Sequence, residues 1–152
     1  MQVESLNATD KKYFENLYKS AFPKEERVDI QTLYDLNSEN LIEIDILKVD
    51  EKNIGLAVIY LNQDIHLLSY FAIDSKYRGQ GLGSKALALL KEKYDDLIIE
   101  IESTNFKNAD DYVIRNRRKA FYIKNGYQVL DDRINYFGIE MELMATTKDA
   151  GI

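Results

Sequence analysis

The stretch that decides the fold reads Asp74-Ser75-Lys76-Tyr77-Arg78-Gly79-Gln80-Gly81-Leu82-Gly83-Ser84, and it runs into good helix formers that continue to residue 94. Its three glycines stand at alternate positions, where a strand is followed by a helix. Such a loop lets several backbone N–H groups converge, and the positive end of the helix dipole attracts anions to the same point. The sequence therefore predicts a phosphate-binding loop, and a tight turn without a ligand is the weaker alternative.

The chain before this loop predicts two helices and an antiparallel meander. A first strand is expected over residues 2–6. A helix follows, with Thr9 as its N-cap and Asp10 as an acid in its first turn, and it ends near Pro23. A second helix with an uneven apolar face follows Pro23 and extends to Leu36. From residue 41 the apolar period becomes two, which predicts strands over 41–46, 54–60 and 65–73 with polar turns between them.

The chain after the loop predicts a strand, a helix and a final pair of strands. The strand is expected over residues 97–102 and the helix over 113–124, ending at an Asn125-Gly126 stop. A polar connection over 103–112 separates these two elements. Two strands end the chain. The first is expected over residues 127–130, with residue 136 as its far limit, and the second over residues 137–145. The sequence contains no internal repeat or linker, so the order of the predicted strands and helices indicates one α/β domain over residues 1–152.

Composition narrows the classes of function. The chain has 152 residues, no cysteine, one histidine and a formal charge of −6. Disulfides, thiolate zinc sites and iron–sulfur clusters are excluded, and no metal is expected. The acidic balance argues against nucleic-acid binding. Residues 1–10 show no signal-peptide pattern and no apolar run reaches the roughly 20 residues that span a bilayer, so we expect a cytoplasmic protein without a membrane partner.

Two familiar phosphate loops fit the glycines poorly. The Walker A string is absent from the sequence. Gly81, Gly83 and Ala86 satisfy the dinucleotide fingerprint G-x-G-x-x-A, but seven residues, 74–80, separate the end of the strand at Ile73 from Gly81. That fingerprint needs its first glycine in a tight turn directly after the strand. The dinucleotide alternative is therefore the weaker one.

Residues 71–84 resemble motif A of the GNAT superfamily of N-acetyltransferases, whose core is R/Q-x-x-G-x-G/A after a strand. Arg78, Gly81 and Gly83 fill this core. Phe121-Tyr122-Ile123-Lys124-Asn125-Gly126-Tyr127 is similar to a second motif of the family, F/L-Y-x-x-x-G-F/Y, and residues 21–27 are similar to an early segment of some bacterial members. The element order agrees over nearly the whole chain, and two motifs about 40 residues apart are specific together.

The resemblance implies a GNAT-like α/β domain with a mixed, mostly antiparallel central sheet, helices on both faces and a splay between the fourth and fifth strands. Acetyl-CoA would lie in this splay as the cosubstrate, its pantetheine along the fourth strand and its pyrophosphate on the loop. The implied cofactor-binding residues are Phe71, Ala72, Ile73, Arg78, Gly79, Gln80, Gly81, Leu82, Gly83 and Ser84. The basic run at residues 115–119 is a candidate for the ribose phosphate or an exposed helix face.

The implied reaction is acetyl transfer to a primary amine by direct attack in a ternary complex. Tyr122 aligns with the family's tyrosine that protonates the leaving sulfur; packing is its alternative role. Glu100 and Glu102 share one face of their strand and are the candidates for the base, with an ion pair to Arg117 or Arg118 as the alternative. His66 stands alone, so a structural contact is favoured over a role as base.

The acceptor is left open by the sequence. It is a small-molecule or protein amine, and the acidic balance favours a cationic one such as a polyamine, an aminoglycoside, a lysine or an N-terminus. Glu25, Glu26 and Arg27 stand where family members often shape the acceptor pocket, although an exposed helix start is slightly favoured.

Several alternatives stay open. One is a noncatalytic acyl-CoA sensor, and a less favoured one is a nucleic-acid-binding domain that uses residues 115–119. Arg115 and Arg118 occupy positions where many members have Asn and Ala, so the coenzyme contacts of this helix are open. A homodimer through the C-terminal strands is also open.

Overall fold

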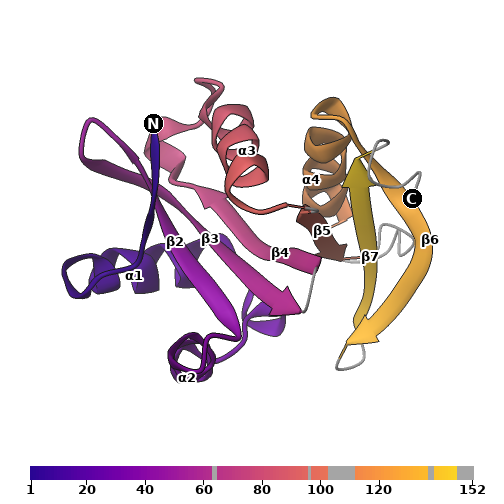
Figure 1. Cartoon of the computed structure of the whole chain (residues 1–152). Helices are drawn as coiled ribbons and strands as arrows, with labels where there is room; N and C mark the ends of the chain where they lie inside the picture. The colour runs from indigo at the N-terminus through magenta and orange to yellow at the C-terminus, as the bar shows by residue number, and fades with distance from the viewer. Residues whose placement is uncertain (63–64, 96, 103–111, 137–138, 147–152) are drawn as a thin grey trace. The chain divides into compact units, whose positions relative to one another are not determined.

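The computed structural model describes the chain except at residues 63–64, 96, 103–111, 137–138 and 147–152 (Figure 1). The chain forms two compact units, residues 1–95 and residues 96–152. Each unit combines antiparallel strands with helices, which confirms the α/β class. One domain over residues 1–152, and the splay between the fourth and fifth strands, stay predictions.

The described residues of the first unit form four strands, three α-helices and three short 3-10 turns. In chain order they are β1 (Gln2–Ser5), η1 (Ala8–Asp10), α1 (Lys11–Ala21), η2 (Lys24–Glu26), α2 (Ile30–Ser38), β2 (Ile42–Val49), β3 (Lys52–Asn62), β4 (Ile65–Ile73), η3 (Ser75–Tyr77) and α3 (Leu82–Lys93). The strands pair in the order β1-β2-β3-β4, and every pairing is antiparallel. The expected meander is confirmed, with β2 and β3 longer than the apolar alternation indicated.

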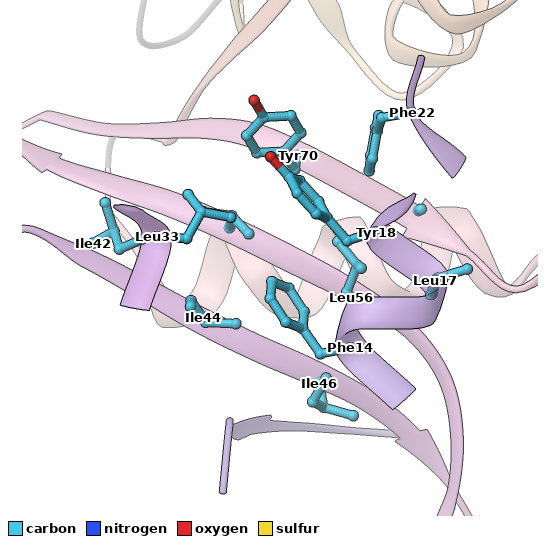
Figure 2. Close-up of a cluster of buried hydrophobic side chains, with 12 residues drawn as sticks. Phe14, Leu17, Tyr18, Phe22, Leu33, Ile42, Ile44, Ile46, Leu56 and Tyr70 are labelled. Atoms are coloured by element: carbon cyan, nitrogen blue, oxygen red, sulfur yellow. The ribbon is translucent and has the colours of Figure 1, made fainter. Parts of the chain in front are cut away.

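Helices α1 and α2 cover one face of these strands. Their apolar residues, among them Phe14, Tyr18 and Leu33, pack on the alternate strand residues that point to the same side (Figure 2). Those strand residues are Ile42, Ile44, Ile46, Leu56, Val58, Tyr70 and Ala72. The burial of this face explains why the alternation of β2 was legible in the sequence.

Helix α3 covers the opposite face. Ala86 of α3 forms a cluster with Leu47 and Ile54, and Phe71 and Ile73 of β4 pack against it. Figure 1 shows α3 on the far side of the strands from α1 and α2. Helices on both faces are therefore confirmed within this unit, and successive residues of β4 contact different helices.

The start of α1 differs from the sequence prediction. The capping side chain is Asn7, whose Oδ1 accepts a hydrogen bond from the Asp10 amide at 3.1 Å. Asp10 is buried instead, where its carboxylate lies 3.0 Å from Lys48 Nζ and accepts from Asn53 Nδ2 at 3.1 Å. The N-cap expected at Thr9 was wrong, because the side chain of Asn7 caps this turn, while Asp10 stands in the first turn as expected. Its pairing with a cation from β2 is a contact distant in sequence.

Strand β4 contains a bulge at Ser69. Val58 of β3 stands opposite Tyr70, and the next residue, Ile59, stands opposite Leu68. One residue of β4 is thus skipped, and a β-bulge of this kind bends the strand and disrupts its ladder locally. The sequence indicated an uninterrupted strand over residues 65–73.

The second unit contains β5 (Leu97–Glu102), α4 (Tyr112–Lys124), β6 (Tyr127–Tyr136) and β7 (Ile139–Thr146). Its strands pair in the order β5-β7-β6, both pairings antiparallel. Helix α4 ends at Lys124, and Gly126, two residues later, has the positive φ of 93° expected of a helix stop. The extension of β6 to residue 136 is confirmed. The polar connection expected over 103–112 lies mostly outside the described residues.

Among the described helices, none combines the length and the apolar character that a bilayer crossing requires. The cytoplasmic location stays a prediction.

Candidate active site

The glycine loop adopts a backbone that only glycine takes without strain. Gly79 and Gly81 have φ values of 82° and 72°, in the left-handed region. Gly81 is the N-terminal cap of α3, and Gly83 lies inside the first turn of that helix. A side chain built at Gly79 or Gly81 would meet no protein atom within 4 Å. The loop is therefore open on the side where these side chains would stand.

The amides of the loop are not used inside the described part of the protein. Arg78 N donates to Ser75 O, and the next backbone donor is Lys85 N, which bonds to Gly81 O. Between them, the N–H groups of residues 79–84 have no acceptor among the described residues. The first N–H groups of a helix lack partners within it, and here no side chain caps them. The loop thus offers a row of donors at the positive end of α3.

Asp74 fixes the start of this loop. Its amide donates to Ile54 O at 2.7 Å, which continues the ladder between β4 and β3. One oxygen of its carboxylate accepts from the Lys76 amide at 3.1 Å, and the other accepts from Tyr13 Oη of α1 at 3.2 Å. Sequence analysis missed this role of Asp74, although an Asp directly before a short polar turn is a recognisable cap.

The backbone groups of alternate β4 residues point away from β3. Because Asp74 N points to β3, the alternation of an antiparallel pair turns Ala72 toward β3 as well and turns Phe71 and Ile73 away from it. Arg78 Nε donates to the outward carbonyl of Ile73 at 3.3 Å, and the Arg78 side chain is exposed. Strand end, arginine and loop therefore form one continuous polar edge in the first unit.

Tyr122 lies on α4 in the second unit, and only 7% of it is exposed. Its ring contacts Phe121 and Tyr127 at centroid distances of 5.2 Å and 6.2 Å. Burial raises the pKa of its phenol above the usual value, Tyr127 adds to this rise, and the charge of Arg118 acts against it. The phenol therefore stays protonated at neutral pH and is available as a donor.

Glu100 and Tyr122 lie on opposite faces of the second unit's strands. Lys119 of α4 pairs with the fully buried Glu142 of β7 at 3.3 Å, so Glu142 and its cross-strand neighbour Ile101 face α4. Glu100, adjacent to Ile101, points to the other face. Burial raises the pKa of its carboxyl, which makes this carboxylate a stronger base than an exposed one. The side chain of Glu102, the other candidate base, lies outside the described residues.

The remaining candidates have structural contacts. His66 Nδ1 donates to the carbonyl of Asp95 at 2.6 Å, and its ring lies 5.5 Å from that of Tyr94. The basic run is partly engaged, since Lys119 binds Glu142 and Arg115, Asn116 and Arg118 have partners in the protein. Arg117 is exposed. His66 therefore has the structural contact that the sequence favoured.

A model of the acetyltransferase (GNAT) domain matches residues 42–129, more than half of the chain. This chain belongs to the GNAT acetyltransferase family. The match includes the glycine loop of the first unit and Tyr122 of the second, so the resemblance drawn from the two motifs is confirmed. No curated protein matches the sequence.

Three solved structures of low sequence identity have a similar fold. One from Bacteroides thetaiotaomicron is 20% identical with a TM-score of 0.78, over 96% of this chain and 86% of that one. The ribosomal-protein-S18-alanine N-acetyltransferase from Escherichia coli is 22% identical with a TM-score of 0.68, over 95% and 92% of the two chains. An aminoglycoside 6'-N-acetyltransferase complexed with coenzyme A is 15% identical with a TM-score of 0.70, over 96% of each.

Proposed function

We propose that this protein transfers an acetyl group from acetyl-CoA to a primary amine. The observation that carries the proposal is the row of N–H groups at residues 79–84, which have no acceptor among the described residues and stand at the positive end of α3. A diphosphate supplies the anionic oxygens that such a row binds. Membership of the family and the coenzyme A complex of a similar structure support acetyl-CoA as its source.

In this proposal the first unit holds the cosubstrate. The amides of residues 79–84 bind the pyrophosphate, and Arg78 adds a charged donor to a phosphate oxygen. The backbone groups of Phe71 and Ile73, which point away from β3, pair with the pantetheine arm as a neighbouring strand would. The chain needs no metal ion for these contacts.

The chemical step divides between two side chains of the second unit. The neutral amine attacks the thioester carbonyl, a C–N bond forms, and the C–S bond breaks as the intermediate collapses. Tyr122, whose raised pKa keeps the phenol protonated, donates its proton to the leaving thiolate. Glu100, whose burial raises its pKa, accepts through water the proton that the amine nitrogen loses, because it lies on the opposite face of the strands from Tyr122. No covalent enzyme intermediate is required.

Two measurements test this function. A ligand at 100 times its Kd adds about 2.7 kcal/mol, which corresponds to roughly 5–10 °C in Tm for a chain of this size, so acetyl-CoA should stabilise the protein and NAD should not. Acetyl-CoA with an amine panel should then release the CoA thiol. Absence of both effects would contradict the proposal.

A noncatalytic acyl-CoA sensor is the second candidate, because the loop alone would serve it equally well. Tyr122→Phe removes only the phenol oxygen. In the enzyme it should lower kcat by about 10²–10⁴-fold and leave the Kd of acetyl-CoA unchanged. In a sensor, both the wild type and the variant would bind acetyl-CoA and release no thiol.

A further inference from the structure

Tyr13 of α1 reaches the end of β4, where the glycine loop begins. Its hydroxyl donates to Oδ2 of Asp74 at 3.2 Å, a contact between residues 61 positions apart in the chain. Oδ1 of the same carboxylate accepts from the Lys76 amide at 3.1 Å and so caps the turn η3. One carboxylate therefore joins a helix on one face of the strands to the turn that leads into the loop.

The aromatic ring of Tyr13 is anchored in the first unit. Tyr13 is half-buried and packs against the core cluster between the strands and helices α1 and α2. Burial raises the pKa of its phenol above the usual value, and the charge of Asp74 adds to this rise. The hydroxyl is therefore protonated at neutral pH, and it stands in a fixed place as a donor to Asp74.

The end of the turn is anchored on the opposite face of the strands. Tyr77, the last residue of η3, and Leu82, the first residue of α3, pack against the cluster that contains Ala86. Residues 78–81 lie between these two anchors, and two of the four are glycines with positive φ. Glycine restrains the backbone least, so the position of the loop depends on the contacts that hold the residues before and after it.

We propose that Tyr13 is a positioning residue for coenzyme binding, which acts through Asp74 on the amides of residues 79–84. This inference rests on the proposed acetyltransferase function. Tyr13 acts by holding the carboxylate that caps the turn. A loop that is ordered before binding loses less conformational entropy when the diphosphate binds, so the bond between Tyr13 and Asp74 strengthens the binding of CoA.

Tyr13→Phe removes only the hydroxyl and keeps the packed ring. The Kd of CoA should rise about 5–10-fold, because binding must then also order the turn and the loop. KM for acetyl-CoA should rise by a similar factor, and kcat at saturating acetyl-CoA should keep its wild-type value. Calorimetric titration with CoA measures Kd, and release of the CoA thiol measures KM and kcat.

Tyr34→Phe is the matched control. Tyr34 of α2 is also half-buried, and its hydroxyl donates to the carboxylate of Glu15 in α1 at 2.7 Å. The control variant therefore loses the same kind of bond, but one that joins α1 to α2. The Tm of both variants should fall by a few degrees, while only Tyr13→Phe should weaken CoA binding. Equal Kd values for the two variants would overturn the inference.

Variants of Asp74 test whether Tyr13 acts through this carboxylate. Asp74→Ala removes both bonds and should raise the Kd of CoA about 10–30-fold. Asp74→Asn keeps an oxygen for the Lys76 amide and adds an NH2 group that can donate to Tyr13, so it should recover most of this loss. Adding Tyr13→Phe to Asp74→Ala should change Kd no further, because the bond is already absent. Additive effects would contradict the route through Asp74.

Hydrogen exchange in the free protein examines the turn without any ligand. The Lys76 amide should exchange about 3–10-fold faster in Tyr13→Phe than in the wild type, and at the wild-type rate in Tyr34→Phe. An unchanged rate in Tyr13→Phe would mean that the hydroxyl does not hold the turn, and would overturn the inference.

The CoA titration separates this inference from the proposed function. If the wild type and Tyr13→Phe bind CoA equally well, the inference is wrong while the proposed function stands. If the wild type binds neither CoA nor acetyl-CoA, the proposed function fails and the inference fails with it. Should Tyr13→Phe not fold, the comparison of Asp74→Ala with Asp74→Asn decides whether the capped turn supports CoA binding.

Discussion

The two ends of α3 treat their polar groups in opposite ways. At the C-terminal end, Asp45 of β2 is fully buried and accepts from Tyr94 Oη at 2.6 Å and from Lys93 Nζ at 3.0 Å. At the N-terminal end, the amides of residues 79–84 have no acceptor among the described residues. One end of the helix is closed by the protein's own side chains, and the other is open.

This difference separates stability from binding. A buried carboxylate with two donors ties α3 to the strands and has no capacity left for a ligand. The open end keeps two left-handed glycines and unbonded amides that add nothing to folding, which is the pattern of a site prepared for a ligand. Substitutions at the two ends should therefore affect different measurements.

The largest effect is expected at the closed end. Asp45→Ala removes both hydrogen bonds and leaves the buried Tyr94 hydroxyl without its acceptor, so the free energy of unfolding should fall by about 3 kcal/mol. The Kd of acetyl-CoA for the folded variant should not change. Urea denaturation and calorimetry below the unfolding transition measure the two quantities.

Asp45→Asn is the matched variant at this end. It keeps an acceptor oxygen for Tyr94 and removes the charge that faces Lys93. Its free energy of unfolding should therefore lie between those of the wild type and Asp45→Ala. A weaker Kd for acetyl-CoA in either folded variant would mean that the closed end also takes part in binding.

Gly81→Ala should affect the open end. A side chain at φ 72° costs roughly 1–2 kcal/mol of backbone strain, and its methyl group would stand on the open side of the loop. We expect Kd for acetyl-CoA to rise about 10–100-fold. Gly126→Ala is the control, because Gly126 has φ 93° and equally open surroundings at the end of α4. It should lose similar stability and keep the wild-type Kd.

Arg78→Gln should have a smaller effect on the same edge. Its side chain is exposed, so solvent weakens its attraction to phosphate, and Kd should rise about 5–10-fold with a shallower dependence on salt. Lys91→Gln makes the same charge change toward the closed end of α3. If the two variants shifted Kd equally, the effect would be one of net charge alone.

The smallest effect concerns Glu100 and pH. Since burial raises its pKa in the folded state, its contribution to stability is greatest below the unfolded value of about 4.5 and is lost as pH rises through the folded pKa. Glu100→Gln should therefore be slightly more stable than the wild type at pH 7 and equal to it at pH 4. Thermal unfolding at the two pH values measures the difference. The reverse order at pH 7 would mean that the carboxylate is stabilised by a partner.

The sequence predicted the open end of α3 better than the closed one. Local signals define the loop, since glycines, a neighbouring arginine and helix formers all lie within residues 74–94. Asp45 appeared only as a polar residue of an alternating strand, because its partners are about 50 residues away in the chain. Ser69 was equally hidden, since a bulge depends on the register with β3. Contacts distant in sequence account for each difference.

Amide NMR spectra recorded during a titration with CoA would test the account most directly. CoA lacks the acyl group, so any change in the amide signals of the loop reports contact with the coenzyme and not with the acyl group. We expect the amide signals of residues 79–84 to shift most and their hydrogen exchange to slow when CoA binds. Unchanged signals from these amides in a protein that calorimetry shows to be saturated with CoA would contradict the central claim.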